Sequence, residues 1–304
     1  MNTVSVSTRT SGVIAGLSSY FLWGFLPLYF LLTGTADALE IVAWRIIWSL
    51  VFCFGILFAT RQFSSTIALL KDRRIIVLTM LAGVLIYLNW QFYIIAVVTG
   101  HIVQGSLGYF INPLVTILLG VVVLGEKLRI GQWTALVFAA VAVIVLIVGY
   151  GEVPWFSFIL AGSFGFYGLV KNRLGGAINA TGSLTFETLW LIPVAIVILI
   201  ISWPTMQFGH GDVLTTVLLV GLGPVTAIPL LLFGFAASKV PLAWMGFMQY
   251  LAPSLQFMVG VAIMHEPMPL PRLLGFALVW VGLIFLSLDS WRHARRSRSN
   301  IFSD

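Results

Sequence analysis

Two charged side chains, Arg45 and Glu187, lie within long apolar stretches of this sequence. A charged group inside a hydrocarbon layer is costly, so a functional role is the first hypothesis for each. Arg45 can act on the charge of a solute or, alternatively, extend its guanidinium group to the membrane interface. Glu187 can bind a proton or a cationic group; alternatively, it caps a helix that begins near Ser183 or forms an interhelical hydrogen bond. Both residues are candidate proton or charge sites.

Amide and aromatic side chains lie deeper in the apolar stretches. An amide presents both hydrogen-bond donors and acceptors. Aromatic rings stack on organic solutes, although rings at helical spacing also pack against lipid or neighbouring helices. The candidate contacts for a small organic solute are Asn112, Tyr109, Asn89, Tyr250, Gln249 and Trp90. Further polar and aromatic candidates are Gln91, Gln256, Trp23, Tyr93, Tyr167 and Trp190.

Two prolines stand beside these candidates, Pro113 after Asn112 and Pro253 near Tyr250. A proline ring removes a backbone donor and frees the carbonyl one turn earlier, which for Pro113 is that of Tyr109. Kinked helices with free carbonyls near the membrane midplane are typical of transporter binding sites. We therefore expect both prolines to kink their helices and to shape a cavity.

The composition excludes several classes of protein. Of the 304 residues, 60% are hydrophobic and only 9% are charged, against roughly 25% charged in an ordinary soluble domain. A soluble enzyme and a nucleic-acid binder are therefore excluded. The single cysteine and four scattered histidines indicate no metal site, and no GxxxxGK[ST] motif is present to bind a nucleotide. We expect no cofactor and no catalytic residues.

Apolar segments long enough to cross a bilayer recur along the whole chain. Such a helix needs about 20 mainly apolar residues, and a segment much longer than that must fold back. The ten predicted spans are residues 12–33, 41–60, 75–98, 104–124, 131–149, 155–170, 183–203, 213–235, 242–264 and 271–288. The predicted fold class is an all-α polytopic membrane protein with ten transmembrane helices.

Lysine and arginine residues indicate the orientation, because cytoplasmic loops are enriched in both. With the N-terminus in the cytoplasm, fourteen of the sixteen lie in cytoplasmic loops or tails, Lys171 among them. The acidic residues Glu40, Glu152 and Glu266 then lie in outer loops. Both termini are cytoplasmic in this arrangement, which requires an even number of spans and agrees with ten.

The sequence contains an internal repeat. Residues 107–113 (LGYFINP) align with residues 247–253 (FMQYLAP) at a shift of 140, which also places Glu126 on Glu266. Each of these glutamates ends a span, where a carboxylate opposes the helix dipole. We interpret both as caps for the helix that follows, with direct solute contact as the alternative.

The repeat divides the chain into two predicted units, residues 1–150 with spans one to five and residues 151–304 with spans six to ten and a basic tail. Because five is an odd number, the second unit must enter the membrane from the opposite side. Inverted repeats of this kind are typical of secondary transporters. The repeat therefore favours a carrier.

Several motifs resemble one family. The string SLGYFINPL at residues 106–114, followed by GEKL at 125–128, resembles the RarD group of EamA-type transporters in the drug/metabolite transporter superfamily. FYGL at 166–169, ETLW at 187–190 and QYLAP at 249–253 are similar to the same family. The resemblance implies a bacterial inner-membrane permease with ten helices in two inverted EamA repeats around a central cavity. It implies no firm substrate.

We predict a secondary transporter that moves a small organic metabolite or drug-like solute across the cytoplasmic membrane by alternating access, in the direction of export. The alternative is a passive facilitator or channel. Residues 148–151 (VGYG) match the core of a potassium filter, but they close a full-length span, whereas such a filter needs a short pore helix and a re-entrant loop. The expected partners are the solute, the lipid bilayer and, as a candidate coupling ion, the proton. No nucleic acid is expected, and a homodimer is compatible with the sequence without being indicated by it.

Overall fold

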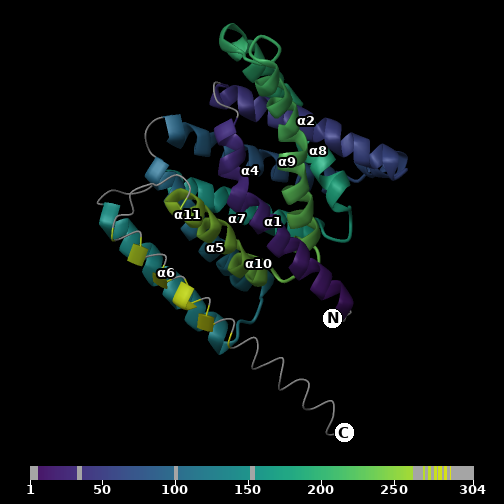
Figure 1. Cartoon of the computed structure of the whole chain (residues 1–304). Coiled ribbons are helices and arrows are strands. Elements are labelled where there is room, and N and C mark those ends of the chain that lie inside the picture. The colour runs from purple at the N-terminus through teal and green to yellow at the C-terminus, as the bar shows by residue number, and fades with distance from the viewer. Residues whose placement is uncertain are drawn as a thin grey trace.

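The computed structural model describes residues 6–32, 36–98, 102–150 and 155–262, together with separate positions between 270 and 288. Within these residues all regular secondary structure is helical (Figure 1). The elements are α1 (Val6–Leu32), α2 (Ala38–Ala59), α3 (Phe63–Ala68), η1 (Leu69–Lys71), α4 (Arg73–Val98), α5 (Ile102–Leu124), α6 (Ile130–Tyr150), α7 (Trp155–Leu174), α8 (Ala180–Ser202), η2 (Trp203–Thr205), α9 (Val213–Ala237), α10 (Leu242–Gln249) and α11 (Leu251–Ala262).

The helices lie where the hydropathy pattern predicts spans one to nine. Four of the described helices, α2, α4, α8 and α9, are long and apolar enough to cross a membrane by length and composition. Span ten lies largely outside the described residues, as does Glu266. The chain is thus an all-helical protein with several apolar helices.

The ninth predicted span consists of two helices instead of one. α10 ends at Gln249 and α11 begins at Leu251, with Tyr250 between them. Pro253 has no backbone N–H to donate to the carbonyl of Gln249, and its ring crowds that carbonyl. By contrast, α5 continues through Pro113. The two prolines that the sequence pairs therefore have different effects on their helices.

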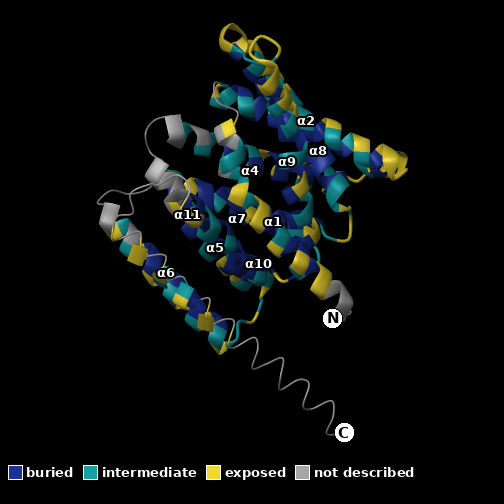
Figure 2. Ribbon diagram, in the orientation of Figure 1, coloured by how far each residue is buried: buried dark blue, intermediate teal, exposed yellow. Residues whose placement is uncertain are grey.

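Figure 2 shows which parts of the helices are exposed and which are buried. Many of the exposed residues are large hydrophobics, whereas several charged and polar residues are buried. Val122, Ile130 and Val148 are more than 70% exposed, whereas Arg45, Glu187 and Lys171 are buried. An apolar surface of this extent would be unfavourable in water. It fits a bundle whose outer helices face lipid, and the chain is a membrane protein.

Helices from the two predicted units interlock. The predicted repeat pairs α1 with α7, α2 with α8, α4 with α9, and α5 with α10 and α11. Under this pairing, the α5–α7 contact corresponds to the α11–α1 contact, and the α4–α7 contact corresponds to the α9–α1 contact. Likewise α2 packs against α9 as α8 packs against α4, while α2–α8 and α5–α10 are contacts between equivalent helices. Each of these contacts therefore either has a counterpart under the predicted repeat or joins two equivalent helices.

Two glycines lie at close helix crossings. A Cβ atom on Gly223 of α9 would lie 2.5 Å from the carbonyl oxygen of Trp48 on α2. A Cβ atom on Gly83 of α4 would lie 2.9 Å from the carbonyl oxygen of Glu187 on α8. These glycines are separated by 140 residues, the same shift that aligns the repeat motifs.

Two acidic residues have other surroundings than the sequence suggests. Glu126 does cap a helix, but its oxygens accept from the N–H groups of Leu242 (2.6 Å) and Ala243 (2.8 Å) in α10, not from the helix that follows it. Glu40, expected in an outer loop, lies fully buried in the first turn of α2. It accepts from the N–H groups of Gln207 and Phe208 because the loop after η2 folds back over it.

Candidate functional site

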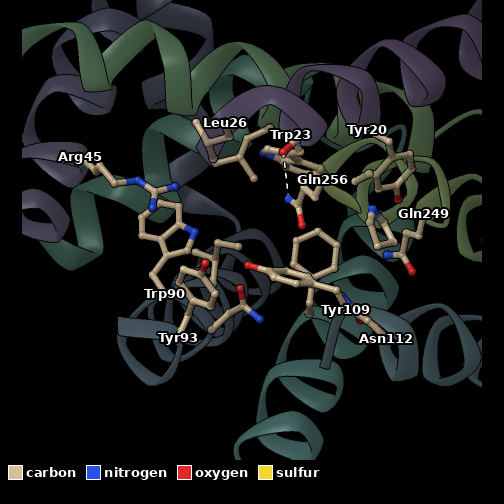
Figure 3. A pocket seen from close by; sticks show the side chains of 16 residues that line it. Tyr20, Trp23, Leu26, Arg45, Trp90, Tyr93, Tyr109, Asn112, Gln249 and Gln256 are labelled. Atoms are coloured by element: carbon tan, nitrogen blue, oxygen red, sulfur yellow. Dashed lines mark hydrogen bonds between the residues drawn. The ribbon is translucent and has the colours of Figure 1, made fainter. Parts of the chain in front are cut away.

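A cavity of about 110 Å³ lies between helices of both units (Figure 3). Its walls are formed by α1, α2, α4, α5, α7, α9, α10 and α11. The described lining residues are Tyr20, Trp23, Leu26, Arg45, Ile86, Asn89, Trp90, Tyr93, Tyr109, Asn112, Phe164, Leu230, Gln249, Ala252, Pro253 and Gln256. Aromatic rings and a few polar groups of this kind are typical of small-molecule sites.

One end of the cavity is cationic. Arg45 projects from α2 and is 8% exposed. Its Nε donates to Oγ1 of Thr226 on α9 at 3.1 Å, and its guanidinium carbon lies 4.4 Å from the ring centroid of Trp90. The stacking and the hydrogen bond fix the guanidinium group inside the bundle. Arg45 thus reaches the cavity, not the membrane interface.

Amide groups lie at the other end of the cavity, where Figure 3 shows Gln249, Asn112 and Tyr20 on the side away from Arg45. The side chains of Asn112 and Gln249 are 7% and 5% exposed. Oδ1 of Asn112 and both amide atoms of Gln249 have no hydrogen-bond partner among the described residues. Buried polar atoms almost always have partners, so this end is poised to bind a hydrogen-bonding group.

The middle of the cavity combines aromatic rings with amides that are already engaged. The rings of Tyr93 and Tyr109 lie 5.7 Å apart. Asn89 donates to the carbonyl oxygen of Leu160 at 2.9 Å, and Gln256 donates to that of Trp23 at 3.1 Å. These amides hold α4 against α7 and α11 against α1, and so fix the width of the cavity.

The structure brings together most of the residues that the sequence singles out. Asn112, Tyr109, Asn89, Gln249, Trp90 and Arg45 all line the cavity, and so does Pro253. Tyr250 and Pro113 are not among the described lining residues. Tyr250 is buried in a satellite core with Phe110 and Ala142.

Glu187 lies outside the cavity in a fully buried polar cluster. Its Oε1 contacts Nζ of Lys171 at 2.6 Å and accepts from Oγ of Ser183 at 2.6 Å. Tyr167 donates to its Oε2 at 3.0 Å. The placement of Lys171 in a cytoplasmic loop is therefore wrong. α7 continues through Lys171 to Leu174, because the lysine finds a carboxylate and a hydroxyl group inside the bundle.

Four aromatic rings connect this cluster with the cavity; we call Trp23, Phe164, Tyr167 and Phe233 the aromatic layer. Neighbouring rings in it have centroids 5.3 Å to 5.8 Å apart. Trp23 and Phe164 line the cavity, whereas Tyr167 bonds to Glu187. The layer therefore links the wall of the cavity to the polar cluster.

A second cavity of about 340 Å³ borders the cluster. It is lined by Lys171 and Ser183, by Lys239 and by the loop between α7 and α8. This loop and Lys239 belong to the face that the charge distribution assigns to the cytoplasm. The polar cluster thus contacts the aromatic layer through Tyr167 and the second cavity through Lys171 and Ser183.

Comparisons with known proteins agree with the motifs. The model of the EamA-like transporter family matches residues 10–148. The protein RarD of Streptomyces exfoliatus is 44% identical over 96% of this chain and 93% of the relative. The chain belongs to the EamA-like transporter family.

Other relatives extend this family assignment along the chain. The protein RarD of Salmonella typhimurium is 41% identical over 92% of this chain and 95% of the relative. The uncharacterized transporter YojE of Bacillus subtilis is 38% identical over 95% of the chain and 97% of the relative. A crystal structure with 17% identity has a TM-score of 0.71 and covers 91% of this chain and 98% of its own, which shows a shared fold.

Some residues of this EamA-like site escape sequence reasoning. Thr226, which binds Arg45, lies in an apolar stretch with nothing to distinguish it. Lys171 could have been found, because it lies four residues after Tyr167 on one helix face, as Ser183 lies four residues before Glu187. That spacing places both pairs around one point where α7 meets α8.

Proposed function

We propose that this EamA-like protein is a secondary transporter that moves a small organic metabolite across the bacterial cytoplasmic membrane by alternating access, in the direction of export. The observation that supports it most directly is the cavity. It lies inside a bundle with an apolar surface, receives residues from both predicted units, and presents buried amide atoms without partners. Its volume, about 110 Å³, favours a small metabolite over a drug-sized solute, for which pockets of roughly 300 Å³ or more are usual.

The proposal includes ten spans in two inverted units, residues 1–150 and 151–304. The exchangeable helix contacts support this symmetry. So do Gly83 and Gly223, which allow the α4–α8 and α9–α2 crossings at a spacing of 140 residues. Two units of similar structure can exchange conformations and so open the cavity to each side in turn.

In this proposal, the aromatic layer is a barrier that must part on one side during this exchange. It closes the cavity toward the Lys171–Glu187 cluster, which the second cavity borders. A movement of α7 relative to α9 would separate Tyr167 from Phe233, whose rings are stacked at 5.6 Å. The two cavities would then join into a path to the face that we assign to the cytoplasm.

Glu187 is the proposed proton site. A proton on its carboxylate would remove the charge that holds Lys171 at 2.6 Å, and this change would act on the junction of α7 and α8. Transport by Glu187→Gln should therefore lose its dependence on the pH gradient. If it keeps the full dependence, the proton assignment is wrong.

A passive facilitator is the second candidate, and one observation favours it. The charge of Glu187 is already balanced by Lys171, and none of the described cavity residues is acidic. A facilitator would show saturable transport that a pH gradient does not drive.

The test is uptake into proteoliposomes over a panel of metabolites, with and without a pH gradient. We expect saturable transport of at least one solute, and a large rise in its KM in Asn112→Ala. Gln91→Ala is the matched control, because Gln91 is also an amide on a helix of the bundle but does not line the cavity. Unchanged affinity in Asn112→Ala would remove Asn112 from the site, and ohmic single-channel current would replace the carrier with a channel.

A further inference from the structure

The cavity is electrically asymmetric. Arg45 is the one charged side chain among its described lining residues. A hydrogen bond to Thr226 and stacking on Trp90 hold its guanidinium group in position. A buried cation raises the local potential strongly where water is scarce. The end of the cavity that contains Arg45 therefore favours an anionic group.

Three acidic residues in the described part of the bundle are engaged elsewhere. Glu187 is bound by Lys171, Ser183 and Tyr167. Glu126 caps α10, and Glu40 accepts from the loop after η2. In the described part of the chain, none of these carboxylates lines the cavity. An ammonium group on a solute would therefore find no carboxylate among the described lining residues.

The opposite end of the cavity calls for a neutral partner. Within the described part of the chain, the donor and the acceptor of the Gln249 amide have no hydrogen-bond partner, and neither has the acceptor Oδ1 of Asn112. A hydroxyl or amide group can satisfy such atoms without bringing a second charge into the bundle. Figure 3 places these amides away from Arg45, with Tyr109 between the two ends. A flat solute body that spans the ends would lie against that ring.

We propose that the cavity binds a small monoanionic carboxylate, with the carboxylate at Arg45, a neutral hydrogen-bonding group at Asn112 and Gln249, and a flat body against Tyr109. This assignment rests on the proposed transport function, because it takes the cavity as the transport site. Arg45 presents a planar fork of donors that matches a carboxylate. Among the described lining residues, a second negative charge on the solute would meet no second cation and an ammonium group would meet no carboxylate, so a monoanion is favoured over a dianion or a zwitterion.

The test compares four probes of nearly the same shape: 4-hydroxybenzoate as the anion, 4-hydroxybenzamide as the neutral molecule, 4-hydroxybenzylamine as the cation and 4-hydroxyphenylglycine as the zwitterion. Binding to the purified full-length protein is measured by calorimetry. We expect the anion to bind at least about tenfold more tightly than any other probe, a difference of about 1.4 kcal/mol. Equal or tighter binding of another probe overturns the proposal, and so does failure of the anion to bind at millimolar concentration.

Variants assign the effect to the two ends. Arg45→Met should weaken binding of the anion at least about tenfold and leave the neutral probe within a factor of two, whereas Arg45→Lys should recover part of the loss. Arg129→Gln is the matched control, because Arg129 also lies over a tryptophan, Trp244, at 5.9 Å but outside the cavity. If Arg45→Met folds and binds the anion as the wild type does, the assignment of the carboxylate to Arg45 is wrong.

Transport measurements separate this inference from the function on which it rests. If the protein in vesicles moves a neutral or cationic solute saturably and ignores the anion, the transporter proposal stands and the anion assignment fails. If the anion binds at the cavity but no panel member crosses the membrane, the anion assignment stands and the transport proposal fails. Saturable transport of the anion that Arg45→Met abolishes supports both.

Discussion

The amide of Gln249 should lower the stability of the protein and strengthen the binding of solute. Both of its polar atoms are buried with no hydrogen-bond partner among the residues that the structure describes, which costs about 1–3 kcal/mol for each unsatisfied group. Gln249→Leu keeps a similar volume and removes the cost, so its melting temperature in detergent should rise. The same variant should bind solute more weakly, because the amide no longer meets it.

Gln91→Leu is the control with the opposite expected sign. Oε1 of Gln91 accepts from the hydroxyl group of Tyr87 at 3.2 Å, so its replacement loses a hydrogen bond that exists. If Gln249→Leu lowers the melting temperature as Gln91→Leu does, the Gln249 amide has a stabilising partner in the protein. That result would contradict its assignment as a group available to a ligand.

Lys171 and Glu187 should behave as one unit in a double-mutant cycle. Both side chains are almost completely buried and their charged atoms are 2.6 Å apart. Removal of one partner leaves an uncompensated charge, which costs about 3–5 kcal/mol in comparable buried pairs. Lys171→Met and Glu187→Gln should each lower the melting temperature strongly, and the double variant should recover much of the loss. Additive losses would show that the two residues contribute independently.

At the scale of helices, Glu126 joins the end of α5 to the start of α10. It satisfies two N–H groups that have no partner within α10. Glu126→Ala should cost about 0.5–2 kcal/mol of stability, as the loss of an N-cap usually does. Unfolding in detergent measures the effect, with Lys127→Ala as the control at the neighbouring position. If Glu126→Ala is as stable as the wild type, the two short hydrogen bonds do not contribute measurably to the free energy of unfolding.

The crossing points of the helices do not tolerate a methyl group. At Gly223 and Gly83 the nearest atom to an added Cβ is a backbone oxygen, at 2.5 Å and 2.9 Å, which cannot move aside as a side chain can. Gly223→Ala and Gly83→Ala should each destabilise the protein by about 1–3 kcal/mol, the usual cost of overpacking. Gly55→Ala in α2 is the control, because its Cβ would meet nothing within 4 Å. Wild-type stability in Gly223→Ala would mean that α2 and α9 cross farther apart.

At the scale of the whole molecule, the positions of the helices could be predicted from hydropathy and length alone. α2, α8 and α9 each begin and end within a few residues of a predicted span. Bilayer thickness and backbone satisfaction restrict the choices so strongly that local sequence suffices. The same reasoning places Lys171 in a loop, because a hydropathy pattern predicts that a single lysine is exposed to water. The pattern carries no information about its partner Glu187, which lies sixteen residues away in the sequence.

The site is predictable in part for a related reason. Amides, aromatic rings and an arginine are expensive in apolar stretches, so Asn112, Gln249 and Arg45 stand out in the sequence. Thr226 and Tyr20 do not, since a threonine or tyrosine in such a stretch is ordinary. Only tertiary packing brings Thr226 to Arg45 and Tyr20 to the cavity. The partner of Glu126 lies 116 residues away in the chain, a contact that no local pattern contains.

The proposed inverted arrangement of the two units predicts which face of the membrane each loop reaches. With Lys171 buried, thirteen of the sixteen basic residues remain on the face that we assign to the cytoplasm, so the asymmetry that orients the chain persists. A reporter active only outside the cytoplasm should therefore function when inserted after Glu152, between the units, and not when fused after Asp304. A fluorescent reporter that matures only in the cytoplasm should give the reverse pattern. Activity of the first reporter at Asp304 would place the two termini on opposite faces and remove the even number of spans on which the inverted repeat depends.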